Sequence, residues 1–169
     1  MEKIIEEIFA ESIAVKQATL AKNCPQIVRA AQSVLTAFKG GHKVFFFGNG
    51  GSAADSQHIA AEFIGRFQKE RKSWPAIALT TDTSILTALG NDYNFDIVFA
   101  RQLEGLGQKG DVAFAISTSG NSKNVLAGVK QARAMGMTTI GVTGGTGGAL
   151  ASACDIVIVA ASPKTARIQ

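Results

Sequence analysis

A chain of 169 residues can form one domain with a substantial core, but it is too short for two domains of ordinary size. Hydrophobic residues make up 46% of the chain and charged residues 18%, a globular composition that excludes a largely disordered protein. The net charge is +4, but the lysines and arginines are scattered and form no stripe with aromatic residues. We therefore expect no nucleic-acid partner, and an anionic small molecule suits this charge at least as well.

The N-terminal residues 1–17 carry four glutamates, which excludes a signal or transit peptide there. The longest apolar runs fall far short of the roughly 20 residues that span a bilayer. These features predict a cytoplasmic protein with no membrane partner. The two cysteines, Cys24 and Cys154, have no metal-type spacing and are interpreted as small buried apolar residues.

The first 39 residues predict two helices, because apolar residues recur at helical spacing between charges. Pro25 is placed like a proline in the first turn of the second helix, and Gly40 and Gly41 end that helix. Beyond residue 43 the pattern changes to short apolar runs, which are typical of strands buried on both faces of a sheet. The predicted strands are 43–47, 76–79, 112–116, 138–142 and 156–160.

Helical patterns alternate with these strands. They cover 53–67, 84–89, 95–106, 125–135 and a short stretch near Leu150. The alternation predicts one α/β domain over residues 1–169, in which 1–39 form N-terminal helices and 43–169 form a five-stranded parallel sheet with helices on both faces. Ligands of such sheets bind outside the carboxyl ends of the strands, at the switch point.

The loop after the first strand, residues 48–54, is rich in glycine and leads directly into a helix. Its glycines let the backbone approach a ligand, the helix N-terminus attracts anions, and Ser52 adds a hydroxyl donor. The spacing of a dinucleotide fingerprint and the lysine of a nucleoside-triphosphate loop are both lacking. A tight turn with a serine cap explains the same residues and stays open as an alternative.

The loop after the third strand, residues 117–122, holds four hydroxyl side chains and a glycine. Capping of the following helix needs one hydroxyl, whereas four of them suit the oxygens of a phosphate monoester. Two such loops at one edge of the sheet favour phosphate binding. A third glycine-rich stretch, residues 143–148, is interpreted as a connecting loop.

The helix after the first loop carries the candidate chemistry. Asp55, His58 and Glu62 share one face, and the last two are one turn apart. Such a pair can ligate a metal ion, and a carboxylate beside a sugar phosphate can transfer a proton. The alternative is an exposed helix face with a common polar pair. Residues 90–94 are predicted to form a turn whose side chains can bond hydroxyl groups, and His42 is interpreted as a surface residue.

The stretches 47–67 and 116–122 together resemble the sugar isomerase (SIS) domain family, whose fold is flavodoxin-like. Shorter matches occur at 75–79, 90–92, 110–112 and 165–169. The resemblance is greatest to members that convert sedoheptulose 7-phosphate to D-glycero-D-manno-heptose 7-phosphate. It implies proton transfer through an enediol, in bacterial ADP-heptose and lipopolysaccharide core biosynthesis.

The resemblance also implies roles for individual residues. Glu62 corresponds to the catalytic glutamate, and His58, Glu62 and Gln169 correspond to ligands of one zinc ion in some members. The family forms homotetramers that share active sites between subunits, and the N-terminal helices help to build them. The residues implied to surround the phosphate are Ser52, Ser117, Thr118, Ser119 and Ser122. Those implied to contact the sugar are Asn49, Gly50, Gly51, Glu62, Asn91, Asp92 and Gln169.

The family pattern continues past Gln169 into a helix with a glutamate and histidines, one of which is a catalytic partner. We therefore expect a truncated C-terminus, a fifth strand without its covering helix and the lack of a second acid/base residue. An alternative function is a non-catalytic SIS protein that binds a replication initiator protein. Such relatives tend to lack the glutamate, so Glu62 favours the enzyme. A regulator that senses a phosphosugar lacks support, because no DNA-binding domain is attached.

Overall fold

Five parallel strands form the centre of the computed structural model, which describes residues 1–169. Their order is β2-β1-β3-β4-β5, so the chain reverses direction across the sheet between β1 and β3. This is the switch point of a doubly wound sheet, and the predicted fold class is confirmed. The strands are β1 (Val44–Gly48), β2 (Ala76–Ala78), β3 (Val112–Ile116), β4 (Thr138–Gly144) and β5 (Ile156–Ala160).

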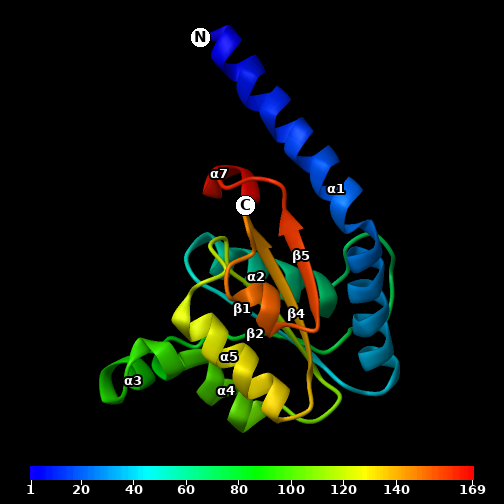
Figure 1. Cartoon of the computed structure of the whole chain (residues 1–169). Helices are drawn as coiled ribbons and strands as arrows, with labels where there is room; N and C mark the ends of the chain where they lie inside the picture. Colours follow the sequence, from blue (N-terminus) through cyan, green and yellow to red (C-terminus); the bar gives the residue numbers. More distant parts are fainter.

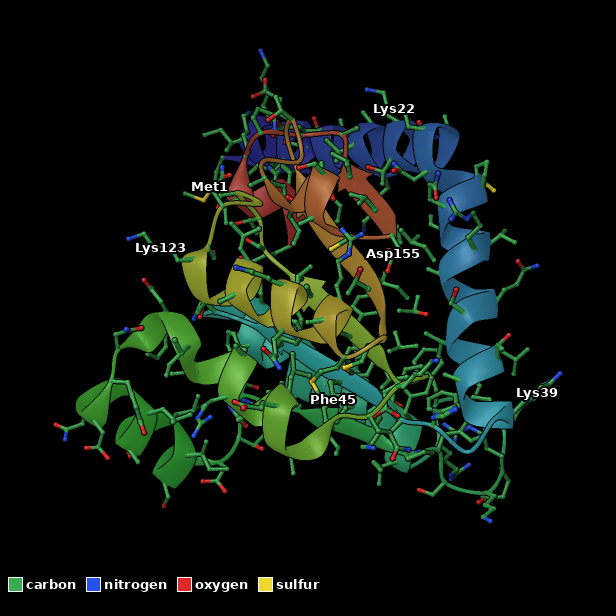
Figure 2. All side chains as sticks on the ribbon, turned by 60° about the horizontal axis from the view of Figure 1, so that its bottom comes forward. Met1, Lys22, Lys39, Phe45, Lys123 and Asp155 are labelled. Carbon is green, nitrogen blue, oxygen red and sulfur yellow. The ribbon has the colours of Figure 1, made fainter.

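Helices cover both faces of the sheet (Figure 1). Alternating residues of β1 show the division, because Phe45 and Phe47 pack against α4 and α5, whereas Phe46 packs toward α1 and α2. Figure 2 labels Phe45, which lies on the side of the sheet covered by α4 and α5. The helices are α1 (Glu2–Lys39), α2 (Gly51–Ile64), α3 (Thr83–Asp92), the 3-10 turn η1 (Phe95–Ile97), α4 (Val98–Leu106), α5 (Lys123–Ala134), α6 (Leu150–Ala153) and α7 (Thr165–Ile168).

The N-terminal segment is one helix of 38 residues, not the two helices that the sequence predicted. Pro25 lies inside it, and Figure 2 shows the ribbon changing direction near Lys22. An interior proline lacks the amide hydrogen for one helical bond and crowds the carbonyl of Ala21, so it bends the helix without ending it. Cys24, beside the bend, is exposed, so the expectation that it is buried is wrong.

Polar side chains attach α1 to the free edge of the sheet. Asn23 donates from Nδ2 to the carbonyl of Val159 at 2.9 Å, and its Oδ1 accepts from the amide of Val159 at 3.0 Å. The Thr19 hydroxyl accepts from the amide of Ala161 at 2.9 Å. These bonds satisfy backbone groups that an edge strand otherwise leaves unpaired.

The face between α1 and α2 is incompletely covered. A hollow of about 450 Å³ opens there, with Phe46, Phe114 and Ile158 of the sheet in its lining. All twelve lining residues are hydrophobic. The N-terminal half of α1 extends beyond the sheet (Figure 1) and exposes further apolar side chains. No helix of the chain is both long and apolar enough to cross a membrane.

Candidate functional site

The loop after β1 meets the first turn of α5, which follows the loop after β3, through two asparagine side chains at the switch point. Asn49 donates from Nδ2 to Oδ1 of Asn124 at 2.8 Å, and Asn124 donates back to Oδ1 of Asn49 at 2.9 Å. Asn124 is 4% exposed, and its Oδ1 also accepts from the amide of Val125. This amide pair holds the loop after β1 and the start of α5 in one relative position. The sequence did not indicate Asn124, because nothing in its neighbourhood marks it as different from a helix surface residue.

The first loop turns sharply into α2. Gly50 is the N-cap residue with φ of 57°, a conformation that favours glycine. Gly48 lies so close to β3 that an added Cβ would meet the carbonyl oxygen of Ile116 at 2.7 Å. Ser52 is buried in the first turn and makes no capping bond. The serine-cap alternative is therefore wrong, and the Ser52 side chain is free to face a ligand.

The second loop arranges its hydroxyls around the start of α5. The Ser117 and Ser122 hydroxyl oxygens lie 3.0 Å apart, and Ser119 is exposed with its oxygen accepting from the amide of Asn121 at 3.2 Å. Ser122 is the N-cap residue of α5 and also makes no side-chain capping bond. Neither α2 nor α5 has an acidic residue in its first turn. Both helix N-termini therefore keep their partial positive charge for an anion.

The third glycine-rich loop, residues 143–148, packs against the hydroxyl-rich loop of residues 117–122. Gly120, with φ of 67°, packs directly on the carbonyl of Gly147, which leaves no room for a side chain. The amide of Leu150 donates to the carbonyl of Gly120 at 2.9 Å, and the amide of Ala149 donates to Oδ1 of Asn121 at 2.9 Å. Its glycines allow this close approach, so the loop shapes the site without adding a hydroxyl cluster of its own.

A cavity of about 330 Å³, here called the switch-point cavity, opens beside these loops. Gln169, the residue after α7, reaches it with its side-chain amide packed against Gly51. The cavity brings together four of the candidate residues, Ser52, His58, Thr118 and Gln169. Asp55 joins them, and apolar residues complete the lining: Ile59, Phe114, Ile116, Val142 and Ile168.

His58 also borders a second hollow of about 480 Å³, which contains Glu62. The Nε2 atom of His58 lies 3.8 Å from Oε1 of Glu62, with His58 73% exposed and Glu62 34% exposed. The α2 helix therefore presents a hydroxyl near its start and an imidazole and a carboxylate further along one face. Such an arrangement can bind an anion at one end and transfer a proton at the other.

Arg71 fixes the far end of α2. Its guanidinium donates to the carbonyl of Glu62 at 2.8 Å and to that of Phe63 at 2.9 Å, and it lies over the ring of Trp74 at 4.3 Å. A cation at this position satisfies free carbonyls and suits the negative end of the helix dipole. Arg71 was not among the predicted residues, although an arginine and a tryptophan beyond a helix end are a usable signal of such a cap.

Comparison with known proteins decides the family. Residues 7–144 match the SIS domain family. Phosphoheptose isomerase of Aquifex aeolicus is 56% identical over 165 residues, which cover 98% of this chain and 86% of that protein. The chain belongs to the SIS domain family, among the phosphoheptose isomerases. It is therefore an isomerase, as the sequence predicted.

Solved structures agree with this membership. Phosphoheptose isomerase from Neisseria gonorrhoeae superposes with a TM-score of 0.93 and is 45% identical, over 99% of this chain and 89% of that one. The phosphoheptose isomerase from Francisella tularensis gives a TM-score of 0.94 at 38% identity, over 98% and 88%. The fold of this isomerase is thus shared over almost its whole length.

Nine residues implied by the resemblance do not line the switch-point cavity of this isomerase: Asn49, Gly50, Gly51, Glu62, Asn91, Asp92, Ser117, Ser119 and Ser122. Asn91 and Asp92 are exposed in the last turn of α3, where Asn91 donates to the Asp92 carboxylate at 2.9 Å. The predicted turn at 90–94 is therefore wrong for its first three residues, which are helical. Neither side chain lines the switch-point cavity. Their contact with the sugar stays a prediction.

The donor set at His58 and Glu62 fits part of a zinc site. Their 3.8 Å separation is small enough that a modest rotation brings both within the roughly 2 Å bonding distances of one ion. Gln169, at the same cavity as His58, can add an amide oxygen. No group of three or more His, Cys, Asp or Glu side chains is arranged to hold a metal ion. Within one chain, His58 and Glu62 are the two side chains at this site whose chemistry suits zinc.

Proposed function

We propose that this isomerase converts sedoheptulose 7-phosphate to D-glycero-D-manno-heptose 7-phosphate, as a step toward ADP-heptose and the lipopolysaccharide core. The observation that carries the proposal is the position of the hydroxyl-rich loop beside α2, whose one face continues to His58 and Glu62. The names of its relatives support a sugar-phosphate substrate. The phosphate would rest on the helix N-termini and the hydroxyls of Ser117, Ser119 and Ser122.

The separation along α2 suits a long sugar phosphate. Ser52 and Glu62 are ten residues apart, which corresponds to about 15 Å along a helix. Helical side chains lean toward the N-terminus, so the Glu62 carboxylate lies nearer the phosphate loop than its backbone does. A seven-carbon chain held by its phosphate would extend along this face and present its carbonyl end toward His58 and Glu62.

Moving a carbonyl between C1 and C2 requires a proton to leave one carbon and arrive at its neighbour, through an enediol. Glu62 is the proposed base, because its carboxylate is partly exposed and lies at the end of α2 away from the phosphate loop. His58 and Glu62 would hold a zinc ion, with Gln169 beside them. When bound, the metal would stabilise negative charge on the substrate oxygens.

We also infer assembly into a homotetramer in the cytoplasm. The exposed apolar side chains on the N-terminal half of α1 support assembly, because a helix face of this kind is normally covered by protein. They include Ile4, Ile5, Ile8, Phe9 and Ile13.

The test is a sedoheptulose 7-phosphate isomerisation assay on the full-length gene product, with Glu62→Gln as the main variant. The amide keeps the shape but removes the base, so we expect a loss of about 10²–10⁴-fold in rate with substrate binding retained. His58→Ala should instead lower the zinc content measured by elemental analysis, and a chelator should reproduce part of its effect. Wild-type turnover by Glu62→Gln would refute the role of Glu62, and an inactive wild-type protein would refute the proposed reaction.

A further inference from the structure

The segment that carries Gln169 depends on contacts from elsewhere in the chain. After β5 the chain turns and forms α7, whose start has no side-chain cap. The amide of Gln169, the residue after α7, donates to the carbonyl of Thr165 at 3.1 Å. The contacts that hold α7 therefore also bear on where the side chain of Gln169 lies in the cavity.

One carboxylate on α1 binds α7 with both of its oxygens. Arg167 donates from Nε to Oε2 of Glu11 at 3.0 Å, and Lys164 donates from Nζ to Oε1 at 2.5 Å. The Arg167 side chain is only 16% exposed, so its contact is the better shielded of the two. The hydrogen bond from Lys164, then that from Arg167, lowers the pKa of Glu11 below its ordinary value. The carboxylate is therefore charged at neutral pH and paired with two cations.

The other side of α7 faces the site. Ile168 packs its side chain on Gly144 at the end of β4, and both Ile168 and Gln169 line the switch-point cavity. The Gln169 amide lies against Gly51 at the start of α2. Figure 1 shows α7 and the C-terminus at the arrowhead end of the sheet, where the strands present their carboxyl ends. The α7 helix is thus held between Glu11 on one side and the cavity on the other.

The contact of Glu11 continues a series along α1. Asn23 binds the backbone of Val159, Thr19 binds that of Ala161, and Glu11 then reaches Lys164 and Arg167. The first two fix the end of β5 and the turn after it. Glu11 extends the same line of attachment to the helix that carries Gln169. The orientation of α1 and the position of Gln169 are consequently linked through side chains in direct contact.

We propose that Glu11 is a positioning residue of the isomerase, which acts through Arg167 and Lys164 to keep Gln169 in the switch-point cavity. The expected loss of kcat rests on the proposed function, whereas the expected change in the position of α7 and Gln169 does not. Without the carboxylate, α7 loses both of its ionic contacts to α1, so the Gln169 side chain is no longer fixed against Gly51. Arg167→Gln removes the better shielded contact from the other side and should have the same effect.

The kinetic test compares Glu11→Gln, Gln169→Ala and the double variant in the full-length protein. We expect Glu11→Gln to lower kcat by about 10–100-fold, with KM changed by less than about twofold because the serine loop is untouched. If Glu11 acts through Gln169, adding Glu11→Gln to Gln169→Ala causes no further loss. Glu7→Gln, one turn away on α1 and without an ion pair, is the matched control and should leave kcat unchanged.

Hydrogen–deuterium exchange measures the same contact without catalysis. The peptide covering residues 161–169 should exchange faster in Glu11→Gln and in Arg167→Gln than in the wild type or in Glu7→Gln. Unchanged exchange would overturn the proposal whether or not the protein is active. A full additional loss of kcat on the Gln169→Ala background would also overturn it, because Glu11 would then act by another route. An inactive wild type with the expected exchange pattern would count against the proposed reaction alone.

Discussion

Replacing Asn124 by alanine tests the contact between the loop after β1 and the start of α5. The variant removes two bonds to Asn49 and the bond that Oδ1 accepts from the amide of Val125. A net contribution of about 1 kcal/mol per bond, with one backbone donor left unpaired, predicts a loss of about 2–3 kcal/mol in the free energy of unfolding. Asn49→Ala should also destabilise the protein, because it leaves the buried amide of Asn124 without its partner.

The double variant distinguishes a direct pair from two independent effects. Two reciprocal bonds predict that Asn49→Ala with Asn124→Ala is less destabilising than the sum of the single changes by about 1–2 kcal/mol. Urea unfolding followed by circular dichroism measures this, at one protein concentration because association would shift the midpoint. Asn91→Ala, whose exposed amide bonds only the neighbouring Asp92, is the control and should change stability by less than about 0.5 kcal/mol. Additivity within about 0.3 kcal/mol would refute the reasoning.

Two further predictions concern the serine loop and the edge of the sheet. Ser119→Ala should weaken binding of sedoheptulose 7-phosphate by about 1–2 kcal/mol, the scale of a hydrogen bond to a charged group, as measured by calorimetry. An unchanged Kd for the double change at Ser117 and Ser119 would contradict phosphate binding at this loop. Burial opposes the charge of Asp155, but bonds from Thr139 outweigh it and lower the pKa of this carboxyl from 3.8. A carboxyl whose pKa is lower in the folded than in the unfolded state stabilises the fold above its unfolded pKa, and this stabilisation is lost as the pH falls. Asp155→Asn should therefore lower the free energy of unfolding by its full amount near pH 7 and by progressively less below about pH 4, as unfolding measurements at several pH values would show.

The sheet could be predicted well because its strands are buried on both faces. An apolar run such as 112–116 leaves few alternatives to a central strand, and β3 has those bounds. The N-terminal helix was harder, because the local pattern around Pro25 is the same for a helix start and for a bend. Only the packing of both halves of α1 on one domain distinguishes the two. The half before Pro25 is bonded through Asn23 and Thr19, and the half after it packs through Ala30 and Ala37.

The sequence indicates candidate site residues where chemistry is concentrated in a short stretch. Hydroxyl density indicated residues 117–122, and helical spacing indicated His58 and Glu62. The groups that hold these residues escaped prediction, because they act across the fold. Asn49 and Asn124 are 75 residues apart, and Glu11 and Arg167 are 156 apart. Nothing local to either partner indicates such a pair.

Contacts at both ends of α2 support the proposal that this one helix relates the two ends of the substrate. Its start is fixed by Gly48 against β3 and by the bond from Asn49 to Asn124, and its end by the bonds from Arg71 to the carbonyls of Glu62 and Phe63. With both ends held, the distance from the hydroxyl loop to Glu62 is set by the roughly 1.5 Å rise of each intervening residue. A shorter sugar phosphate could occupy the hydroxyl loop equally well, yet its carbonyl would stop short of the carboxylate. Discrimination by length would then fall on the chemical step rather than on binding, because only a chain long enough to reach Glu62 gains stabilisation in the transition state.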